Sequence, residues 1–297
     1  MWSRPGQMER RKVALKVFYL GWMYEGFAKQ KRTRQTVEGH LHYAILKAKL
    51  TPSIESSEYS RGGRTDTGVC AYGQVVSLLL RTRKTEKGQT EIPYTLAINR
   101  HLPRSIRVLS WAYVPASFSA RFSCKHRVYR YYLPQGSLDV ASMRRGASLF
   151  VGKHCFRHFC VKSKEDERYE RTVDRAEILS SGEGMCVFEV VSRGFLYRQV
   201  RCMAGILLLV GEGKRQPEYI AELLSLSAAE KKPGYQPAPP QNLVLYDCVY
   251  DGVCFETAPA ECERLGRDLA EEHLEKQVEE AVLRGSVEYL GGLCGGV

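Results

Sequence analysis

The sequence predicts an α/β fold of the α+β kind, built from two successive halves of similar pattern. Segments with strand periodicity alternate with segments of helical periodicity, and a similar series begins again near Pro115. The 297 residues, of which 44% are hydrophobic, suffice for one large or two modest domains. We therefore expect a basic N-terminal arm over residues 1–12, α/β halves over 13–112 and 113–257, and an acidic helical tail over 258–297.

The first half begins with an expected strand at residues 13–19, where apolar side chains recur at every second position. A helix follows at residues 36–50, with apolar residues at helical spacing and Thr36 as its N-cap. The remaining expected elements are an apolar strand at 75–80, a short helix at 94–99 and a strand at 106–111. This order predicts a sheet that helices cover on one face.

The second half opens with an expected strand at residues 126–133, on which Arg127, Tyr129 and Tyr131 share one face. The further expected elements are a helix at 144–150, strands at 171–179 and 185–191, a helix at 198–210 and a strand-like run at 243–250. Prolines stiffen an irregular segment at residues 231–241. From Pro259 onward, spaced leucines and valines predict an amphipathic helix.

The charge balance indicates a polyanionic partner. The chain has 44 Lys and Arg against 33 Asp and Glu, a formal net charge of +11. Nucleic acid is the first candidate partner and an anionic membrane surface the second. Residues 261–280 carry eight acids and three basic residues, a local charge of −5, so the polyanion site is expected before the tail.

Ten cysteines are spread over the chain without a Cys-x-x-Cys pair or a secretory signal, which favours a reducing intracellular compartment. The apolar run at 205–211 is too short to span a bilayer. One cluster, His154, Cys155, His158 and Cys160, has residue types that bind zinc. It lacks the paired spacing of structural zinc sites, so we expect packing residues and no metal.

The stretch SRGGRTDTGV at residues 60–69 is the first candidate functional site. Its glycines allow a tight turn that presents Arg64 and Asp66, a pair suited to gripping an anion or to acid/base or nucleophilic chemistry. A turn aspartate bonded to its own backbone, beside a solvated arginine, is the simpler interpretation of these ten residues alone. The stretch does not match a phosphate-binding P-loop, because a β-branched apolar run follows where that motif needs a lysine and a helix.

Two further segments leave alternatives open. The loop at residues 20–28, rich in aromatic residues and close to basic ones, suits either base stacking or packing within the fold. Arg201 lies off the apolar stripe of its helix, one turn before Ala204 and Gly205. Those small residues would let another backbone cover Arg201, whereas a surface arginine is the simpler interpretation of the helix alone.

Several separated motifs, in order from about Val13 to Tyr250, together resemble the TruA type of pseudouridine synthase. The motifs are YLGWMYEGFA at 19–28 with Gln30, GRTD at 63–66 with GV at 68–69 and AYGQV at 71–75, ARFS at 120–123 with YRY at 129–131, GFLYRQVRCM at 194–203, and APP at 238–240 with Leu243 and Leu245. The first motif, residues 195–213 and Cys70 most resemble the eukaryotic branch that modifies positions thirty-eight and thirty-nine of the tRNA anticodon arm.

This resemblance implies two ferredoxin-like halves whose sheets join across a central basic cleft, plus a C-terminal helix. It implies an isomerase that breaks the glycosidic C–N bond of uridine, rotates the uracil and rejoins it through C5. It further implies tRNA as the substrate, a homodimer, no cofactor and no membrane association, in the nucleus or the cytoplasm.

The resemblance also assigns roles to single residues. Asp66 would be the catalytic carboxylate, by attack at C1′ or by assisting elimination through a glycal. Arg201 would pair with it and keep it ionised, and Tyr129 would stack on the uracil and relay a proton. Arg64 would fill the space left by the flipped nucleotide. The remaining assignments are Arg61 and Arg127 as RNA contacts, and Leu243 or Leu245, left undecided, as the apolar wall of the pocket.

Two other functions compete with this interpretation. A non-catalytic RNA-binding protein or RNA chaperone would have the same positive charge and aromatic loops, whatever Asp66 does. A zinc-dependent nucleic-acid module or deaminase would use the cluster at residues 154–160. That cluster lacks the His-x-Glu and Pro-Cys-x-x-Cys arrangement of such enzymes, which disfavours this function.

Overall fold

The computed structural model describes residues 9–83, 91–162, 168–182, 184–227, 230 and 234–293. Its contacts divide the chain after Glu256 into two units, and residues on both sides of the boundary expected at 112–113 belong to the first. The second unit contains the tail helix, α6 (Pro259–Leu293). Residues 1–8 of the expected arm, residues 231–233 of the proline-rich segment and Cys294 lie outside the described residues.

Strands and helices alternate in the first half in the order that the residue pattern predicts. The first strand begins at Arg10, so residues 10–12, expected in the arm, belong to the ladder with β3. The elements are β1 (Arg10–Tyr19), η1 (Gly21–Met23), α1 (Val37–Lys47), η2 (Glu55–Ser57), β2 (Ser60–Arg61), β3 (Cys70–Arg81), α2 (Tyr94–Asn99) and β4 (Ile106–Tyr113).

The second half repeats the alternation, and it adds strands β6 and β10 and helix α5, which the sequence pattern did not predict. Strand β6 includes two members of the His/Cys cluster. The elements are β5 (His126–Pro134), α3 (Val140–Ser148), β6 (Gly152–Cys155), η3 (Arg157–Phe159), β7 (Glu170–Ser180), β8 (Met185–Ser192), α4 (Gln199–Gly211), α5 (Tyr219–Ser225), η4 (Pro240–Asn242), β9 (Leu243–Val249) and β10 (Glu256–Thr257).

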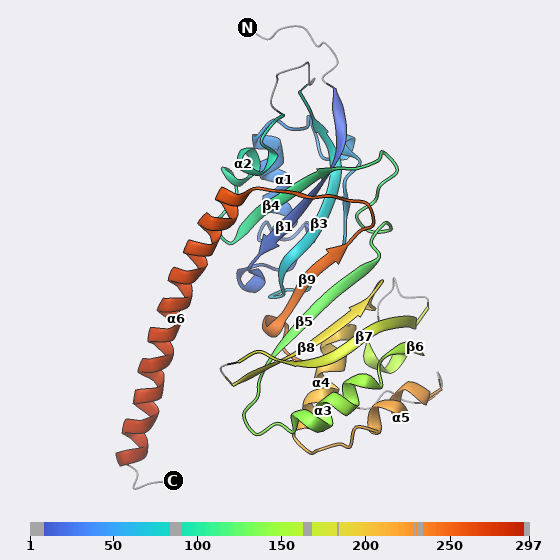
Figure 1. Ribbon diagram of the computed structural model, residues 1–297, viewed down its shortest axis with the longest axis vertical. Coiled ribbons are helices and arrows are strands. Elements are labelled where there is room, and N and C mark those ends of the chain that lie inside the picture. The colour runs from blue at the N-terminus through green and yellow to red at the C-terminus, as the bar shows by residue number, and fades with distance from the viewer. Residues whose placement is uncertain are drawn as a thin grey trace. The chain divides into compact units, whose positions relative to one another are not determined.

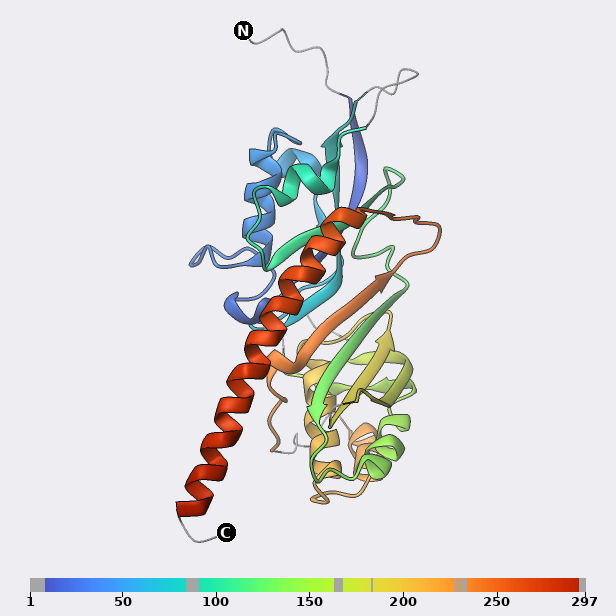
Figure 2. The ribbon, with the colours of Figure 1, turned by 60° about the vertical axis from the view of Figure 1, so that its left-hand side comes forward.

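One mixed sheet joins the two halves, as the fold class predicts. From β4 its strand order is β4-β1-β3-β9-β5-β8-β7-β6. The halves meet where β9 pairs in parallel with β3, at Cys70↔Val244 and Ala71↔Leu245. On its other side β9 pairs antiparallel with β5, and Figures 1 and 2 both show it between β3 and β5. After the second half, the chain therefore adds β9 between the two halves of the sheet, next to the loop that precedes β3.

Helices pack against the strands of each half (Figure 1). In the first half α2 contacts β4 and α1; in the second α3 contacts β7 and α4. The alternating burial of β5 places Arg127, Tyr129 and Tyr131 on its buried face, as expected. The core includes fully buried Tyr19, Tyr131 and Phe188. None of the helices in the described ranges is long and apolar enough to cross a bilayer.

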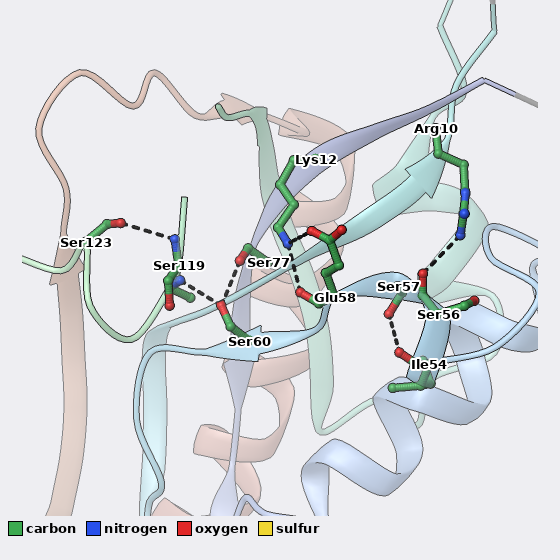
Figure 3. A network of polar contacts seen from close by, with 11 residues as sticks. Arg10, Lys12, Ile54, Ser56, Ser57, Glu58, Ser60, Ser77, Ser119 and Ser123 are labelled. Atoms are coloured by element: carbon green, nitrogen blue, oxygen red, sulfur yellow. Dashed lines mark hydrogen bonds and ion pairs between the residues drawn. The ribbon is translucent and has the colours of Figure 1, made fainter. Parts of the chain in front are cut away.

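A network of polar contacts holds the start of β1, residues 10–12, which the sequence analysis expected in the arm (Figure 3). Lys12 is 7% exposed and its Nζ lies 3.1 Å from Oε2 of Glu58 and 2.8 Å from the Glu58 carbonyl oxygen. Arg10 donates to the carbonyl oxygen of Ser56 at 3.1 Å. The basic residues that begin β1 therefore bind the segment just before β2, rather than forming a free arm.

Candidate active site

The loop between β2 and β3 carries Asp66 and is held in shape by its neighbours. Gly62 donates to the carbonyl oxygen of Val75 at 2.7 Å, and the Gln74 amide bonds both N–H and C=O of Gly63, at 3.2 and 3.0 Å. Gly68 has φ of +80°, a left-handed conformation that a side chain would strain. Asp66 thus lies on a turn with a fixed path.

The end of β1 and the aromatic-rich loop at residues 20–28 both contact this turn. The Tyr19 hydroxyl lies 2.8 Å from Oγ1 of Thr65, and the Phe27 N–H donates to the Thr65 carbonyl oxygen at 3.1 Å. Tyr24 and Phe27 are buried, at 6% and 0% exposure. For these two side chains the structure selects packing, the second of the two roles that the sequence left open.

Arg201 reaches Asp66 from α4. Its Nη1 donates to Oδ2 of Asp66 at 3.0 Å, and its Nε donates to the carbonyl oxygen of Ala238 at 2.8 Å. The Arg201 side chain is 11% exposed and that of Asp66 is 19% exposed. The guanidinium is therefore held at two points, which gives the ion pair a defined geometry in a partly shielded site.

The small residues after Arg201 explain its burial, the less simple of the two interpretations that the sequence left open. The segment at 236–238 crosses α4 so closely that a Cβ on Gly205 would lie 2.6 Å from the Gln236 carbonyl oxygen. The Ala238 N–H donates to the Arg201 carbonyl oxygen at 2.9 Å. Arg201 is consequently covered by this backbone rather than exposed on the helix surface.

A second arginine, which the sequence analysis missed, also approaches Asp66. Nε of Arg198 lies 3.7 Å from Oδ2 of Asp66. Arg198 precedes α4 with φ of 60° and ψ of 17°, a left-handed conformation for a residue with a Cβ. No sequence signal marks it, because arginine has no preference for this conformation.

Tyr129 projects from β5 into the same site. It is 9% exposed, and its ring meets that of Phe195 edge-on, with centroids 5.2 Å apart. Burial raises the pKa of the Tyr129 phenol well above its usual value, so the hydroxyl stays protonated at neutral pH. Leu243 lines the site, whereas Leu245 is fully buried opposite Tyr129. The choice that the sequence left undecided therefore falls on Leu243.

A cavity of about 890 Å³ brings most of the predicted residues together. Its lining includes side chains from β2, the β2–β3 loop, β5, the start of α4 and β9. The predicted residues among them are Arg61, Arg64, Asp66, Arg127, Tyr129, Arg201 and Leu243.

Two of the expected RNA contacts also bind protein groups. Arg127 is 9% exposed, and its guanidinium donates to the carbonyl oxygens of Gly62, Arg121 and Arg193. Its N–H groups thus brace the loop before Asp66, and its contact with RNA stays a prediction. Nη1 of Arg61 lies 2.5 Å from a carboxylate oxygen of buried Glu38. Arg64 is exposed and lines the cavity.

The His/Cys cluster lies away from this cavity. Cys155 is exposed on β6, His158 is buried, and Nε2 of His154 bonds the Val151 carbonyl oxygen at 2.9 Å. Among the described residues no three His, Cys, Asp or Glu side chains are grouped to hold a metal ion. None of the nine cysteines in the described ranges forms a disulfide.

Comparison with known proteins adds to the geometry. Residues 147–251 match the family model described as tRNA pseudouridine synthase. The human tRNA pseudouridine(38/39) synthase is 43% identical over 82% of this chain and 56% of its own length, and the Saccharomyces cerevisiae protein of that name is 40% identical over 81% and 58%. This chain thus spans little more than half the length of these two relatives.

An archaeal relative matches this chain over most of the length of both proteins. The tRNA pseudouridine synthase A of Thermococcus kodakarensis is 35% identical over 88% of this chain and 93% of its own length. Since more than 30% of the aligned residues are identical and the match extends over nearly all of that relative, this chain belongs to the TruA-type tRNA pseudouridine synthase family.

Proposed function

We propose that this chain isomerises uridine to pseudouridine in the anticodon arm of tRNA, with Asp66, Tyr129 and Arg201 as its catalytic residues. The observation that carries the proposal is the ion pair of Asp66 with Arg201, at 3.0 Å, in a cavity that Tyr129 also lines. The names of the eukaryotic relatives support positions 38 and 39 as the targets.

The proposed reaction begins at the everted uridine. The Asp66 carboxylate attacks C1′, or assists elimination to a glycal, and the C1′–N1 bond breaks. The free uracil rotates and C5 bonds to C1′. In the first route the C1′–O bond to Asp66 breaks in this step, and in the second Asp66 returns to C2′ the proton that it removed. C5 then releases its proton to water and N1 takes one up, so the product is an isomer of uridine; no electrons are exchanged, and the reaction requires no redox cofactor.

The surrounding residues suit the other steps. The protonated Tyr129 hydroxyl can relay a proton while its ring stacks on the uracil, and Leu243 supplies an apolar wall. Exposed Arg64 can occupy the space that the flipped nucleotide leaves. Arg201 holds the Asp66 carboxylate in place while the base moves.

Release of tritium from C5 of uridine tests the proposal. With tRNA labelled at C5, the parent protein should release tritium to water, and Asp66→Asn should release none. Release by Asp66→Asn at the parental rate would refute the assignment of Asp66. Binding of tRNA without release by the parent would instead support the non-catalytic RNA-binding alternative.

The role of Arg201 is separable from RNA binding. We expect Arg201→Ala to reduce turnover by about 10²-fold or more, because its charge acts at the chemical step, while the Kd for tRNA changes little. Equal losses in turnover and in binding would indicate an RNA contact instead.

Two further proposals concern assembly and location. By analogy with the family we propose a homodimer, which light scattering of the purified protein would test. We also propose that the protein acts in the nucleus or the cytoplasm, where fluorescence microscopy of the tagged protein would detect it.

A further inference from the structure

Two aromatic side chains at the cavity of Asp66 are exposed to solvent, and each has an arginine on its ring. Phe122 is 71% exposed, with Cζ of Arg121 5.2 Å from the ring centroid. Tyr197 is 41% exposed, with Cζ of Arg198 4.9 Å from the ring centroid. All four residues line the cavity. One exposed aromatic residue is ordinary on a protein surface, but two such pairs at one cavity suggest recognition.

The backbone on both sides of Phe122 is firmly held. The Ala120 N–H donates to Oγ of Ser60 at 2.8 Å, a contact that ties this segment to β2, and Ser119 and Ser123 bond each other across the turn (Figure 3). The Ala120 carbonyl oxygen accepts from the Tyr250 hydroxyl at 2.6 Å. A fixed backbone therefore presents an unburied ring beside the site.

Tyr197 is similarly anchored at the start of α4. Its carbonyl oxygen accepts from the Val161 N–H at 3.0 Å, and the preceding Leu196 N–H donates to Oε1 of Gln199 at 2.8 Å. Arg198, whose backbone is left-handed, brings its guanidinium close to both the Tyr197 ring and Asp66. This second ring is thus connected to the carboxylate through one side chain.

We propose that the Arg121/Phe122 and Tyr197/Arg198 pairs are stacking platforms for the unpaired bases next to the everted uridine, the arginines contacting the adjoining phosphates. The proposal rests on the function proposed above, in which one base leaves the stack and its neighbours lose a stacking partner. Exposed aromatic faces beside cations are the usual means of binding single-stranded RNA, because every base offers a π-face and every linkage a negative charge.

Binding to an anticodon stem-loop RNA tests the platforms. In an Asp66→Asn background, which keeps the RNA unmodified, we compare Phe122→Ala and Tyr197→Ala by fluorescence anisotropy. Each should raise the Kd about 5- to 150-fold. Tyr43→Ala is the matched control: Tyr43 is 54% exposed with Nζ of Lys47 5.5 Å from its ring centroid, but it lies outside the cavity lining. It should change the Kd less than twofold.

The base itself is then removed from the RNA. Stem-loops with an abasic site on the 5′ or 3′ side of the target uridine should bind the parent protein more weakly. A variant that lacks the ring should bind no more weakly than the parent to the RNA that lacks the base stacked on that ring. We therefore expect Phe122→Ala to cause no further loss of affinity for one of the two abasic RNAs, and Tyr197→Ala to cause none for one of them. The platform proposal would be refuted if each substitution weakened binding to every abasic RNA as much as to the intact one, or if both variants kept the parental Kd.

The two proposals fail in different ways. If the wild-type protein releases no tritium from C5-labelled tRNA but the binding experiment shows the coupling, the catalytic proposal fails and the platforms remain. If tritium is released and the coupling is absent, the platforms alone are refuted. Both rings are largely outside the core, and thermal melting of each variant verifies that it is folded.

Discussion

Nε of Arg198 lies 3.7 Å from Oδ2 of Asp66, the oxygen that accepts a hydrogen bond from Arg201. Arg198 reaches it from a left-handed backbone, with φ of 60°, a conformation that costs an L-residue about 1–2 kcal/mol. Strain of this kind persists where the surrounding structure enforces it, and it concentrates at functional sites. The Asp66 carboxylate is therefore approached by two cations from the beginning of one helix.

Arg198→Asn should separate strain from function, because asparagine tolerates the left-handed conformation. We expect the free energy of unfolding to rise by up to about 1 kcal/mol and single-turnover tritium release to fall about tenfold or more. Arg198→Lys is the matched control, since it keeps the charge without the planar fork. Unchanged turnover in the Asn variant would mean that the Arg198 guanidinium has no part in the reaction.

Arg127 and Arg64 should differ in what they stabilise. Arg127→Gln leaves buried carbonyl groups without their donor, so the free energy of unfolding should fall by about 2 kcal/mol or more. The salt dependence of RNA binding should stay unchanged. Arg64→Gln, at an exposed position, should leave stability within about 0.5 kcal/mol and lower the slope of log K against log salt by about 0.7.

The reverse pattern would support the predicted contact of Arg127 with RNA. A stable Arg127→Gln protein with a reduced salt slope would identify Arg127 as an RNA contact. Denaturant titration and anisotropy at several salt concentrations measure both quantities on the same preparations.

The pKa of Tyr129 sets a limit on the pH dependence of the reaction. Burial raises this pKa above the ordinary value of about 10, so a hydroxyl that acts in its protonated form is lost only at still higher pH. We expect kcat/KM for tritium release to show no alkaline decline caused by Tyr129 between pH 7 and 10. Tyr129→Phe should reduce turnover by about 10²-fold or more, since it removes the proton relay.

An alkaline decline below pH 10 that disappears in Tyr129→Phe would contradict this interpretation, because it would show the phenol ionising in that range. Tyr131→Phe is the control on the same face of β5, since Tyr131 is fully buried and its hydroxyl bonds the Pro239 carbonyl oxygen. Its pH profile should match the parent's.

Local pattern predicted much of the sheet and left open whether backbone covers Arg201, but it did not predict the contacts of Arg127. The pairing of Arg201 with Asp66 was implied by the family resemblance. Alternation along β1 and β5 and small residues in α4 are properties of neighbouring residues, which a sequence displays. The acceptors of Arg127 are carbonyl oxygens of residues 62, 121 and 193, and any residue type offers a carbonyl there. Distant backbone partners leave no compositional signal.

Two further differences follow from the same physics. Leu243 and Leu245 are two positions apart on one strand and share a face, so spacing could not decide which lines the cavity. Leu243 is the first residue of β9 and lines the cavity, whereas Leu245 lies between its paired residues on β3 and β5. The basic residues at the start of β1 are typical of a solvent-exposed arm. Lys12 instead buries the aliphatic part of its side chain, and its Nζ contacts Glu58.

Gly205 tests the close crossing that covers Arg201. Gly205→Ala would place a Cβ 2.6 Å from the Gln236 carbonyl oxygen, so the segment at 236–238 must move. Overpacking costs about 1–3 kcal/mol, against a gain of up to about 1 kcal/mol in helix propensity. We expect a lower free energy of unfolding and reduced turnover, because the carbonyl oxygen of Ala238 fixes Nε of Arg201.

Gly234→Ala is the matched control, because a Cβ at Gly234 meets no atom within 4 Å. It should be neutral or slightly stabilising, since it restricts the unfolded chain. Denaturant unfolding and single-turnover tritium release measure both variants. If Gly205→Ala were as stable and as active as Gly234→Ala, the segment at 236–238 could shift without disturbing the ion pair. The position of Arg201 would then depend on Asp66 itself rather than on the backbone that crosses α4.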